Sequence, residues 1–211
     1  MKRDRGKTDG AIVATKQGNF KMKRKIIVKA PILSRSGYGE QSRFALRALR
    51  SREDVFDIYI QPIAWGQTGW IWEDNEFRSW MDEKIIGTQI ALQEKKLQPD
   101  MSLQVTIPNE FEEMATVNVG YTAGIESTAC SAQWLEVTNK VVNNIIVVSS
   151  FSEKAFTETV YTGEVNGQPV QLKLEKPIDH VNYAVKDYEN VEPLDLPLDY
   201  DVNFVSVAQW G

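Results

Sequence analysis

Disulfides, membrane spans and a basic surface are all missing from this sequence. Cys130 is the single cysteine, so no internal disulfide can form and a reducing compartment, the cytoplasm, is expected. No apolar run approaches the roughly 20 residues of a membrane-spanning helix, and no apolar segment follows the basic N-terminus as a secretory signal would require. The net charge of −5 gives no indication of a nucleic-acid partner.

Metal-binding and hydrolytic patterns are scarce as well. His180 is the single histidine, and no cluster of histidine and cysteine surrounds it, so we expect neither a metal nor a bound cofactor. No nucleophile elbow is present, which leaves a Ser-His-Asp triad unsupported. We therefore interpret His180 as a structural residue in a strand-like run near the end of the domain.

The composition that remains is that of a globular protein with one large domain, or one domain and a fragment. The chain has 211 residues, of which 42% are hydrophobic and 25% are charged. Residues 1–24 are polar and basic with little apolar periodicity. They are expected to form a disordered leader, although an arm that contacts an acidic surface stays open.

A strand, a glycine-containing loop and a helix are predicted in succession between residues 25 and 50. The apolar run 26–30 predicts the strand, and an amphipathic helix is expected from near Glu40. Gly37 and Gly39 lie between them. They form either a tight turn that needs positive φ, or a place where a ligand approaches the helix N-terminus, whose free N–H groups suit an anion or a hydroxyl-rich molecule. Arg43 stands where the dinucleotide fingerprint would have its third glycine, so that fingerprint is not matched.

Strands and helices continue to alternate, which predicts an α/β, Rossmann-like, doubly wound domain with a mostly parallel sheet. The run 144–149 is the most strongly β-forming stretch and is expected to be a central strand, buried on both faces. Asn166-Gly167 predicts a hairpin inserted on the main sheet. Further strands are expected at 56–61, 102–107, 116–121 and 178–184, with helices at 76–96, at 132–141 and from residue 150, where Ser152 would be the N-cap.

The last part of the sequence divides into three pieces. The domain is expected to span residues 25–190, and residues 191–201 have the acidic, proline-containing composition of a linker. The strand-like run 202–208 is either an edge strand of the same sheet or the first strand of a second domain that is cut short. We favour the second interpretation for residues 202–211.

Loops at the carboxyl ends of the predicted strands collect the candidate binding residues. Tryptophans crowd the loop 64–72, where they would stack on sugars or else pack in the core. Glu110, Glu112 and Glu113 are interpreted as a solvated acidic loop rather than a catalytic pair. Because ligands of parallel α/β sheets bind at this edge, the mixture of glycine, tryptophan and carboxylate suits carbohydrate.

The order of these pieces resembles the N-terminal half of GT-B glycosyltransferases, in particular the retaining family-4-like group (glycosyltransferase group 1). Four stretches carry the resemblance: the glycine loop and helix start at 36–43, the strand and turn at 120–126, the helix, strand and helix passage at 134–152, and the run 203–208 after the linker. No single motif is diagnostic, so the resemblance is mosaic.

The resemblance implies a glycosyltransferase of two Rossmann-like domains, with the active site between them and the acceptor held mainly by the N-terminal one. Gly37, Tyr38 and Gly39 match the loop that approaches the phosphates or sugar of the donor. Glu126, Trp70 and Arg43 would serve the acceptor. The resemblance assigns no catalytic residue within this chain.

The implied partners are a nucleotide-sugar as co-substrate and a hydroxyl acceptor such as a glycan or a lipid, with peripheral membrane association left open. Since the second domain supplies most donor contacts, this chain alone is expected to be inactive. The alternative is a non-catalytic Rossmann-like domain that binds carbohydrate or a protein partner.

Overall fold

The computed structural model describes residues 22–123, 125–185, 192, 196–197 and 200–206. The leader predicted for residues 1–24 therefore lies outside the described residues up to position 21. The linker predicted for 191–201 lies outside them for the most part.

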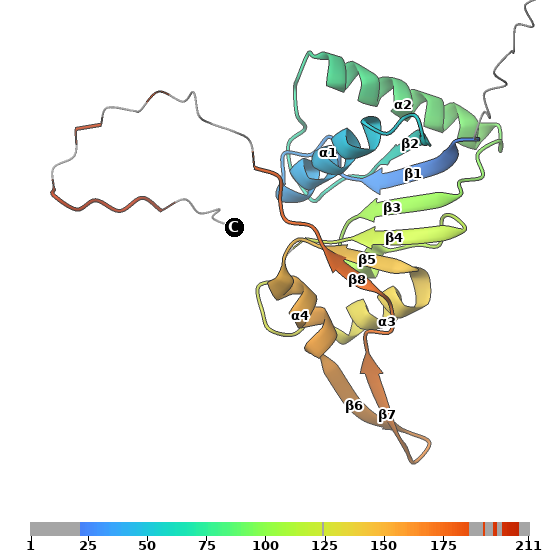
Figure 1. The fold of residues 1–211 in the computed structure, drawn as a ribbon, viewed down its shortest axis with the longest axis vertical. Coiled ribbons are helices and arrows are strands. Elements are labelled where there is room, and N and C mark those ends of the chain that lie inside the picture. The colour runs from blue at the N-terminus through green and yellow to red at the C-terminus, as the bar shows by residue number, and fades with distance from the viewer. Residues whose placement is uncertain (1–21, 124, 186–191, 193–195, 198–199, 207–211) are drawn as a thin grey trace, which may run out of the picture.

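One sheet of six parallel strands forms the body of the molecule (Figure 1). Its strands stand in the order β2-β1-β3-β4-β5-β8, and every neighbouring pair is parallel. The predicted α/β, Rossmann-like class is thus confirmed. The strands are β1 (Arg24–Ala30), β2 (Phe56–Pro62), β3 (Met101–Val105), β4 (Val117–Tyr121), β5 (Asn144–Val147) and β8 (Ile178–His180).

Four α-helices connect these strands, each close to its predicted place. They are α1 (Gly37–Arg50), α2 (Glu76–Gln93), α3 (Ala132–Val141) and α4 (Ser150–Glu158), with one 3-10 turn, η1 (Pro108–Glu110), after β3. The prediction of Ser152 as the N-cap of α4 was wrong. Ser149 has the extended backbone of a cap, and its side chain accepts a hydrogen bond from the Ser152 amide.

The start of α1 was also predicted too late. Ser36 caps the helix by accepting a hydrogen bond from the amide of Gly39, so the helix begins at Gly37 rather than near Glu40. The two glycines of the predicted loop therefore belong to the first turn of α1.

The expected hairpin is present, but it forms a sheet of its own. Strands β6 (Val160–Val165) and β7 (Gln168–Lys173) pair only with each other and project away from the body (Figure 1). Asn166 and Gly167 make the turn with φ values of 53° and 76°. These positive φ angles match the right-handed twist of a two-residue hairpin, which is why Asn-Gly specifies the turn.

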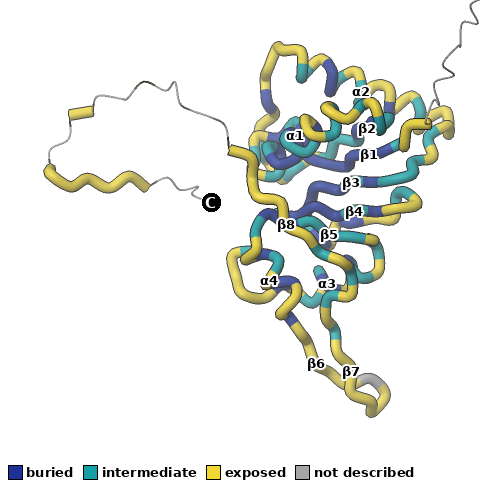
Figure 2. The backbone as a smooth tube through the Cα atoms, in the orientation of Figure 1, coloured by how far each residue is buried: buried dark blue, intermediate teal, exposed yellow. Residues whose placement is uncertain are grey.

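Burial is deepest along β1, which lies between β2 and β3 (Figure 2). Residues 26–30 are all buried, so both faces of this strand are covered, as expected for a parallel sheet. The strand predicted at 144–149 is present as β5, inside the sheet and parallel to both neighbours, but it ends at Val147 and only Ile145 and Val147 are fully buried, so the expected burial on both faces was wrong. Around it Leu135 of α3 and Phe156 of α4 form a second cluster of core residues.

The chain leaves the sheet earlier than predicted. Strand β8 has three residues and ends at His180, so residues 181–185 continue as an exposed segment, the strap (Figure 2). No strand is formed at 202–206, and residues 207–211 lie outside the described part. The division of the chain into a domain, a linker and a second domain stays a prediction.

Candidate functional site

The strand order fixes where a ligand would bind. From β1 the chain moves to β2 on one side and later to β3 on the other, so the direction of winding reverses at β1. In open parallel sheets the crevice beside such a reversal, outside the carboxyl ends of the strands, is the usual binding place. We call the loops that meet there the carboxyl rim: residues 31–36, 63–75, 106–112, 122–123 and 125–131.

Arg43, on α1, binds the first loop of the rim through hydrogen bonds. The guanidinium is buried, and its Nη1 donates hydrogen bonds to the carbonyl oxygens of Ile32 and Ser34, both at 2.9 Å. Its Nε donates to Glu40 at 3.1 Å and its Nη2 at 2.6 Å. Arg43 was predicted to serve the acceptor, and these bonds show that it supports the loop.

Gly39 is required by close packing rather than by backbone angle. A Cβ at this position would lie 2.2 Å from the carbonyl oxygen of Ser34, whereas one on exposed Gly37 would meet nothing within 4 Å. The glycines with positive φ in the described part are Gly66 and Gly167, so the tight-turn interpretation of Gly37 and Gly39 was wrong. Of the predicted donor residues, Gly37 is exposed, Tyr38 is half-buried and Gly39 is buried.

A chain of hydroxyl groups joins the loops that follow β1 and β2. Ser34 Oγ donates to Ser36 Oγ at 2.8 Å and lies 2.6 Å from Thr68 Oγ1. Thr68 in turn donates to the carbonyl oxygen of Trp65 at 2.7 Å. The network connects sequence positions more than 30 residues apart, and it fixes the tryptophan-rich loop against the start of α1.

Tyr38 makes the corresponding connection to the loop after β4. Its hydroxyl lies 2.9 Å from Thr122 Oγ1 and accepts a hydrogen bond from the Ala123 amide at 3.1 Å. Its ring packs on Trp65, with centroids 4.4 Å apart. Burial raises the pKa of the Tyr38 phenol, although the Thr122 and Ala123 bonds partly oppose the rise. The phenol therefore stays a neutral structural group rather than a base.

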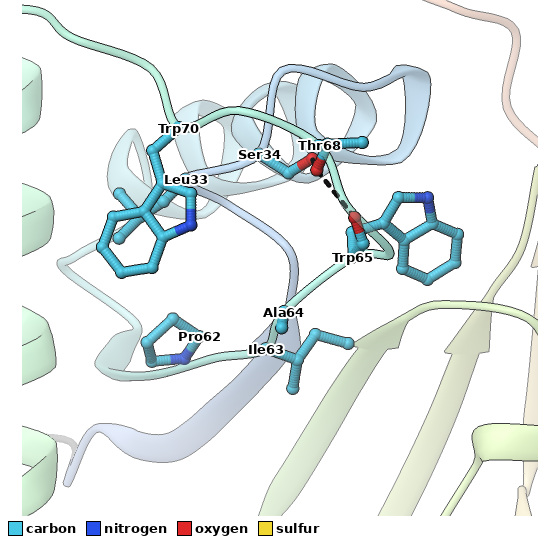
Figure 3. Close-up of a pocket in the computed structure, with 8 residues that line it drawn as sticks. All are labelled: Leu33, Ser34, Pro62, Ile63, Ala64, Trp65, Thr68 and Trp70. Atoms are coloured by element: carbon cyan, nitrogen blue, oxygen red, sulfur yellow. Dashed lines mark hydrogen bonds between the residues drawn. The ribbon is translucent and has the colours of Figure 1, made fainter.

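A small hollow opens in the rim beside Trp70 (Figure 3). The Trp70 and Pro62 rings flank it, while the Trp65 ring points the other way, towards Tyr38. Trp70 is 69% exposed, so its face is free to stack on a ligand. This Trp70 hollow has a volume of about 130 Å³ and is lined by Leu33, Ser34, Pro62, Ile63, Ala64, Trp65, Thr68 and Trp70.

The tryptophans thus divide between the two interpretations that the sequence left open. Trp80, on α2, is buried in the core, and Trp65 is half-buried. Trp70 and Trp72 are exposed in the loop after β2.

Lys29, in β1 just before the rim, is a residue that sequence reasoning missed. It is buried near the end of β1, donates to the carbonyl oxygen of Glu110 at 2.9 Å and forms a salt bridge with Glu112 at 3.0 Å. Glu110 also accepts a hydrogen bond from the Thr106 hydroxyl. A lysine among the apolar residues 26–30 was the available signal, since buried lysines are rare unless they are paired. Glu110 and Glu112 thus attach the acidic loop to Lys29 and Thr106. Glu113 is exposed.

Glu126, predicted to serve the acceptor, and His180, expected to be structural, lie apart from this network. Glu126 is exposed in the loop after β4 and has no hydrogen bond or ion pair to the other candidate residues in the described part. His180 is exposed at the end of β8, where its Nδ1 lies 2.6 Å from a carboxylate oxygen of Glu153. Tyr38 packs on Trp65, and Trp65 and Trp70 line one hollow, while Glu126 shares only the same edge of the sheet.

Comparisons with protein-family models, with curated proteins and with solved structures find no match. Within the described ranges, no three histidine, cysteine, aspartate or glutamate side chains gather as a metal site would need. The helices among those residues are all too short or too polar to cross a membrane. What is assigned is therefore a Rossmann-like α/β domain with a six-stranded parallel sheet.

Proposed function

We propose that this chain is the acceptor-side domain of a GT-B-type glycosyltransferase, which transfers a sugar from a nucleotide-sugar to a hydroxyl acceptor. The proposal rests on one observation above all. Trp70, in the loop after β2, presents an exposed face on the same carboxyl edge of the parallel sheet as the N-terminus of a 14-residue helix.

Each part of this arrangement suits one side of a transfer reaction. An indole face offers an apolar plane to the C–H surface of a sugar ring. A helix N-terminus carries free N–H groups and partial positive charge, which would stabilise the charge that develops on a departing diphosphate. Gly37, as the exposed first residue of α1, is where such a phosphate would approach the backbone.

Binding of neutral oligosaccharides, followed by tryptophan fluorescence and by NMR, tests the acceptor part of the proposal. We expect saturable binding that Trp70→Ala weakens roughly three- to tenfold, because the stacking face is lost. Trp72→Ala is the matched control, since Trp72 is 87% exposed but does not line the Trp70 hollow. Equal effects of the two substitutions, or no binding at all, would contradict the proposal.

Turnover of nucleotide-sugars separates the enzyme from a non-catalytic sugar-binding domain. The resemblance assigns most donor contacts to a second Rossmann-like domain, so the 211-residue chain alone is expected to bind the acceptor without transferring sugar. Transfer by this chain alone would show that the cleft is more complete than we propose. Acceptor binding that persists without transfer, even when a donor-binding domain of this enzyme class is joined to the chain, would favour the non-catalytic alternative.

A further inference from the structure

A second hollow, apart from the one beside Trp70, lies between α1, the end of β4 and the strap 181–185. Its volume is about 200 Å³. Apolar and aromatic side chains make most of its walls, and none of its lining residues is charged. We call it the Gln41 hollow; it is lined by Gln41, Phe44, Ala45, Ala48, Tyr121, Val181, Asn182, Tyr183 and Ala184.

The side-chain amide of Gln41 is the unusual feature of this hollow. The residue is 1% exposed, and neither its amide oxygen nor its amide nitrogen has a hydrogen-bond partner. Tyr121, at the end of β4, lines the same hollow. Burial and Tyr183 raise the pKa of the Tyr121 phenol and Gln41 opposes the rise, but no bond of ordinary geometry joins the two side chains.

An unpaired buried amide destabilises the folded chain, because it has lost water and gained nothing in return. A leucine fills nearly the same space without that penalty. Buried polar groups without partners are few in native proteins, and each calls for a reason. Here a reason is available, since Gln41 lines a hollow large enough to receive a partner.

We propose that the Gln41 hollow binds the acetamido group of an N-acetylated amino sugar, which would make such sugars the acceptor class of the proposed transferase. A carboxamide offers a donor and an acceptor, so it can bond to either the N–H or the C=O of an acetamido group. The apolar walls, with Phe44 and the rings of Tyr121 and Tyr183, would take its methyl group. This inference rests on the proposed function.

Size and charge favour an acetamido group over a nucleotide. The hollow is smaller than the 300–1,000 Å³ typical of whole-ligand pockets, so it suits one substituent of a larger molecule. A nucleotide would bring phosphate next to a lining that offers no lysine or arginine. A sugar held on the rim brings no such charge.

Binding requires a small rearrangement that the structure permits. Both amide atoms of Gln41 are shielded from water, so the side chain must rotate to turn its amide into the hollow. The strap that forms the opposite wall is exposed along its length, with Val181 at 53% and Tyr183 at 48%. In Figure 1 it runs from β8 past the side of α1, where a shift of the strap would widen the hollow without disturbing the sheet.

Two sugars that differ only in the group of interest provide the test. The intact chain, with its glutamine side chains labelled with ¹⁵N, is titrated with the methyl glycosides of N-acetylglucosamine and of glucose. We expect the acetamido sugar to shift the Gln41 side-chain resonance and to bind roughly tenfold more tightly than glucose, because a site that pairs with a polar group discriminates against the analogue that lacks it.

Gln41→Leu tests the same residue from the protein side. We expect it to weaken binding of the acetamido sugar roughly tenfold, while the melting temperature stays the same or rises, because the unpaired amide is gone. The control Gln133→Leu, at an exposed position on α3, should change neither quantity. A purely structural glutamine would give the opposite pattern, with a lower melting temperature and unchanged binding, and that would overturn the proposal.

Other outcomes separate this inference from the proposed function. Equal affinity for the two sugars, with binding still dependent on Trp70, would overturn the acetamido site and leave the acceptor-side domain standing. Uridine or adenosine shifting the Gln41 resonance more strongly than either sugar would overturn it in favour of a nucleobase.

Discussion

The guanidinium of Arg43 and the carbonyl oxygen of Ser34 lie 2.9 Å apart, and this hydrogen bond fixes the entry of the chain into α1. The same nitrogen also donates to the carbonyl oxygen of Ile32, so one side chain satisfies two backbone groups of the loop. The conformation of the rim beside the Trp70 hollow thus depends on a residue in the second turn of the following helix.

Replacing Arg43 by lysine should destabilise the fold. A lysine carries a single ammonium on a flexible stem and cannot reproduce the fork that meets both carbonyl groups and Glu40. We expect the free energy of unfolding in urea to fall by about 1–3 kcal/mol, the range for leaving buried polar groups unpaired. Arg52→Lys, at an exposed ion pair with Asp54, should change it by less than about 0.5 kcal/mol, and a loss of similar size there would contradict the assignment.

The two glycines of α1 should respond to alanine in opposite directions. Gly39→Ala places a Cβ 2.2 Å from a backbone oxygen that cannot move freely, so we expect a loss of about 1–3 kcal/mol. Gly37→Ala meets open space in the first turn of a helix, and it should be neutral or should stabilise by up to about 1 kcal/mol. Thermal or urea unfolding of both variants checks this; if they behave alike, close packing is not what selects glycine at position 39.

Alkaline pH should destabilise the protein partly through Tyr38. Its pKa is raised above 10.0 in the folded chain, so the folded state holds this proton more tightly than the unfolded state does. The stabilising contribution is complete below about pH 10 and is lost as pH rises through the folded pKa. Tyr38→Phe should therefore lose stability less steeply than the native chain above pH 10, although at pH 7 it should be about 1 kcal/mol less stable, because its two hydrogen bonds are gone.

Urea unfolding at a series of pH values provides the measurement for Tyr38. Tyr59→Phe is a useful comparison, since burial also raises that phenol's pKa but its hydroxyl bonds to Asp57 on the same strand. Identical slopes above pH 10 for the native chain and Tyr38→Phe would show that Tyr38 does not titrate in this way.

Cys130 should be unreactive until the protein opens. The thiol is buried, and burial raises its pKa, so little thiolate is present and what forms is inaccessible. We expect a thiol reagent such as Ellman's to label the folded chain at least about 1,000-fold more slowly than the chain in urea, in line with an opening free energy of several kcal/mol. Fast labelling under native conditions would mean that the cluster around α3 and α4 is loosely packed.

Local patterns in the sequence were sufficient to predict most of the fold. The apolar run at 26–30 predicted the buried strand β1, because a strand covered on both faces needs no alternation. Asn166-Gly167 predicted the hairpin turn, because few residue pairs adopt two positive φ angles in succession. The boundaries of α3 agreed to the residue, since its apolar positions repeat with the helical period.

The candidate site was harder to predict, since it depends on contacts between distant positions. Nothing near Gly39 in the sequence shows that the carbonyl of Ser34 would lie against it. The sequence therefore predicted either a turn or a ligand approach at Gly39, and not the close packing that requires glycine there. Lys29 and Glu112 are 83 positions apart and meet only because β1 and β3 are neighbours in the sheet. The unpaired amide of Gln41 is equally invisible, because a glutamine on a helix is normally solvated.

The long path from β5 to β8 bears on how the protein emerges from the ribosome. Helix α4 and the projecting hairpin come between Val147 and Ile178, so β8, which pairs with the outer edge of β5, is synthesised some 30 residues after it. During that interval a row of unpaired backbone groups next to a β-branched apolar strand is open to a neighbouring nascent chain. The three residues of β8 cover this edge. Until they are synthesised, the nascent domain stays open to aggregation through β5.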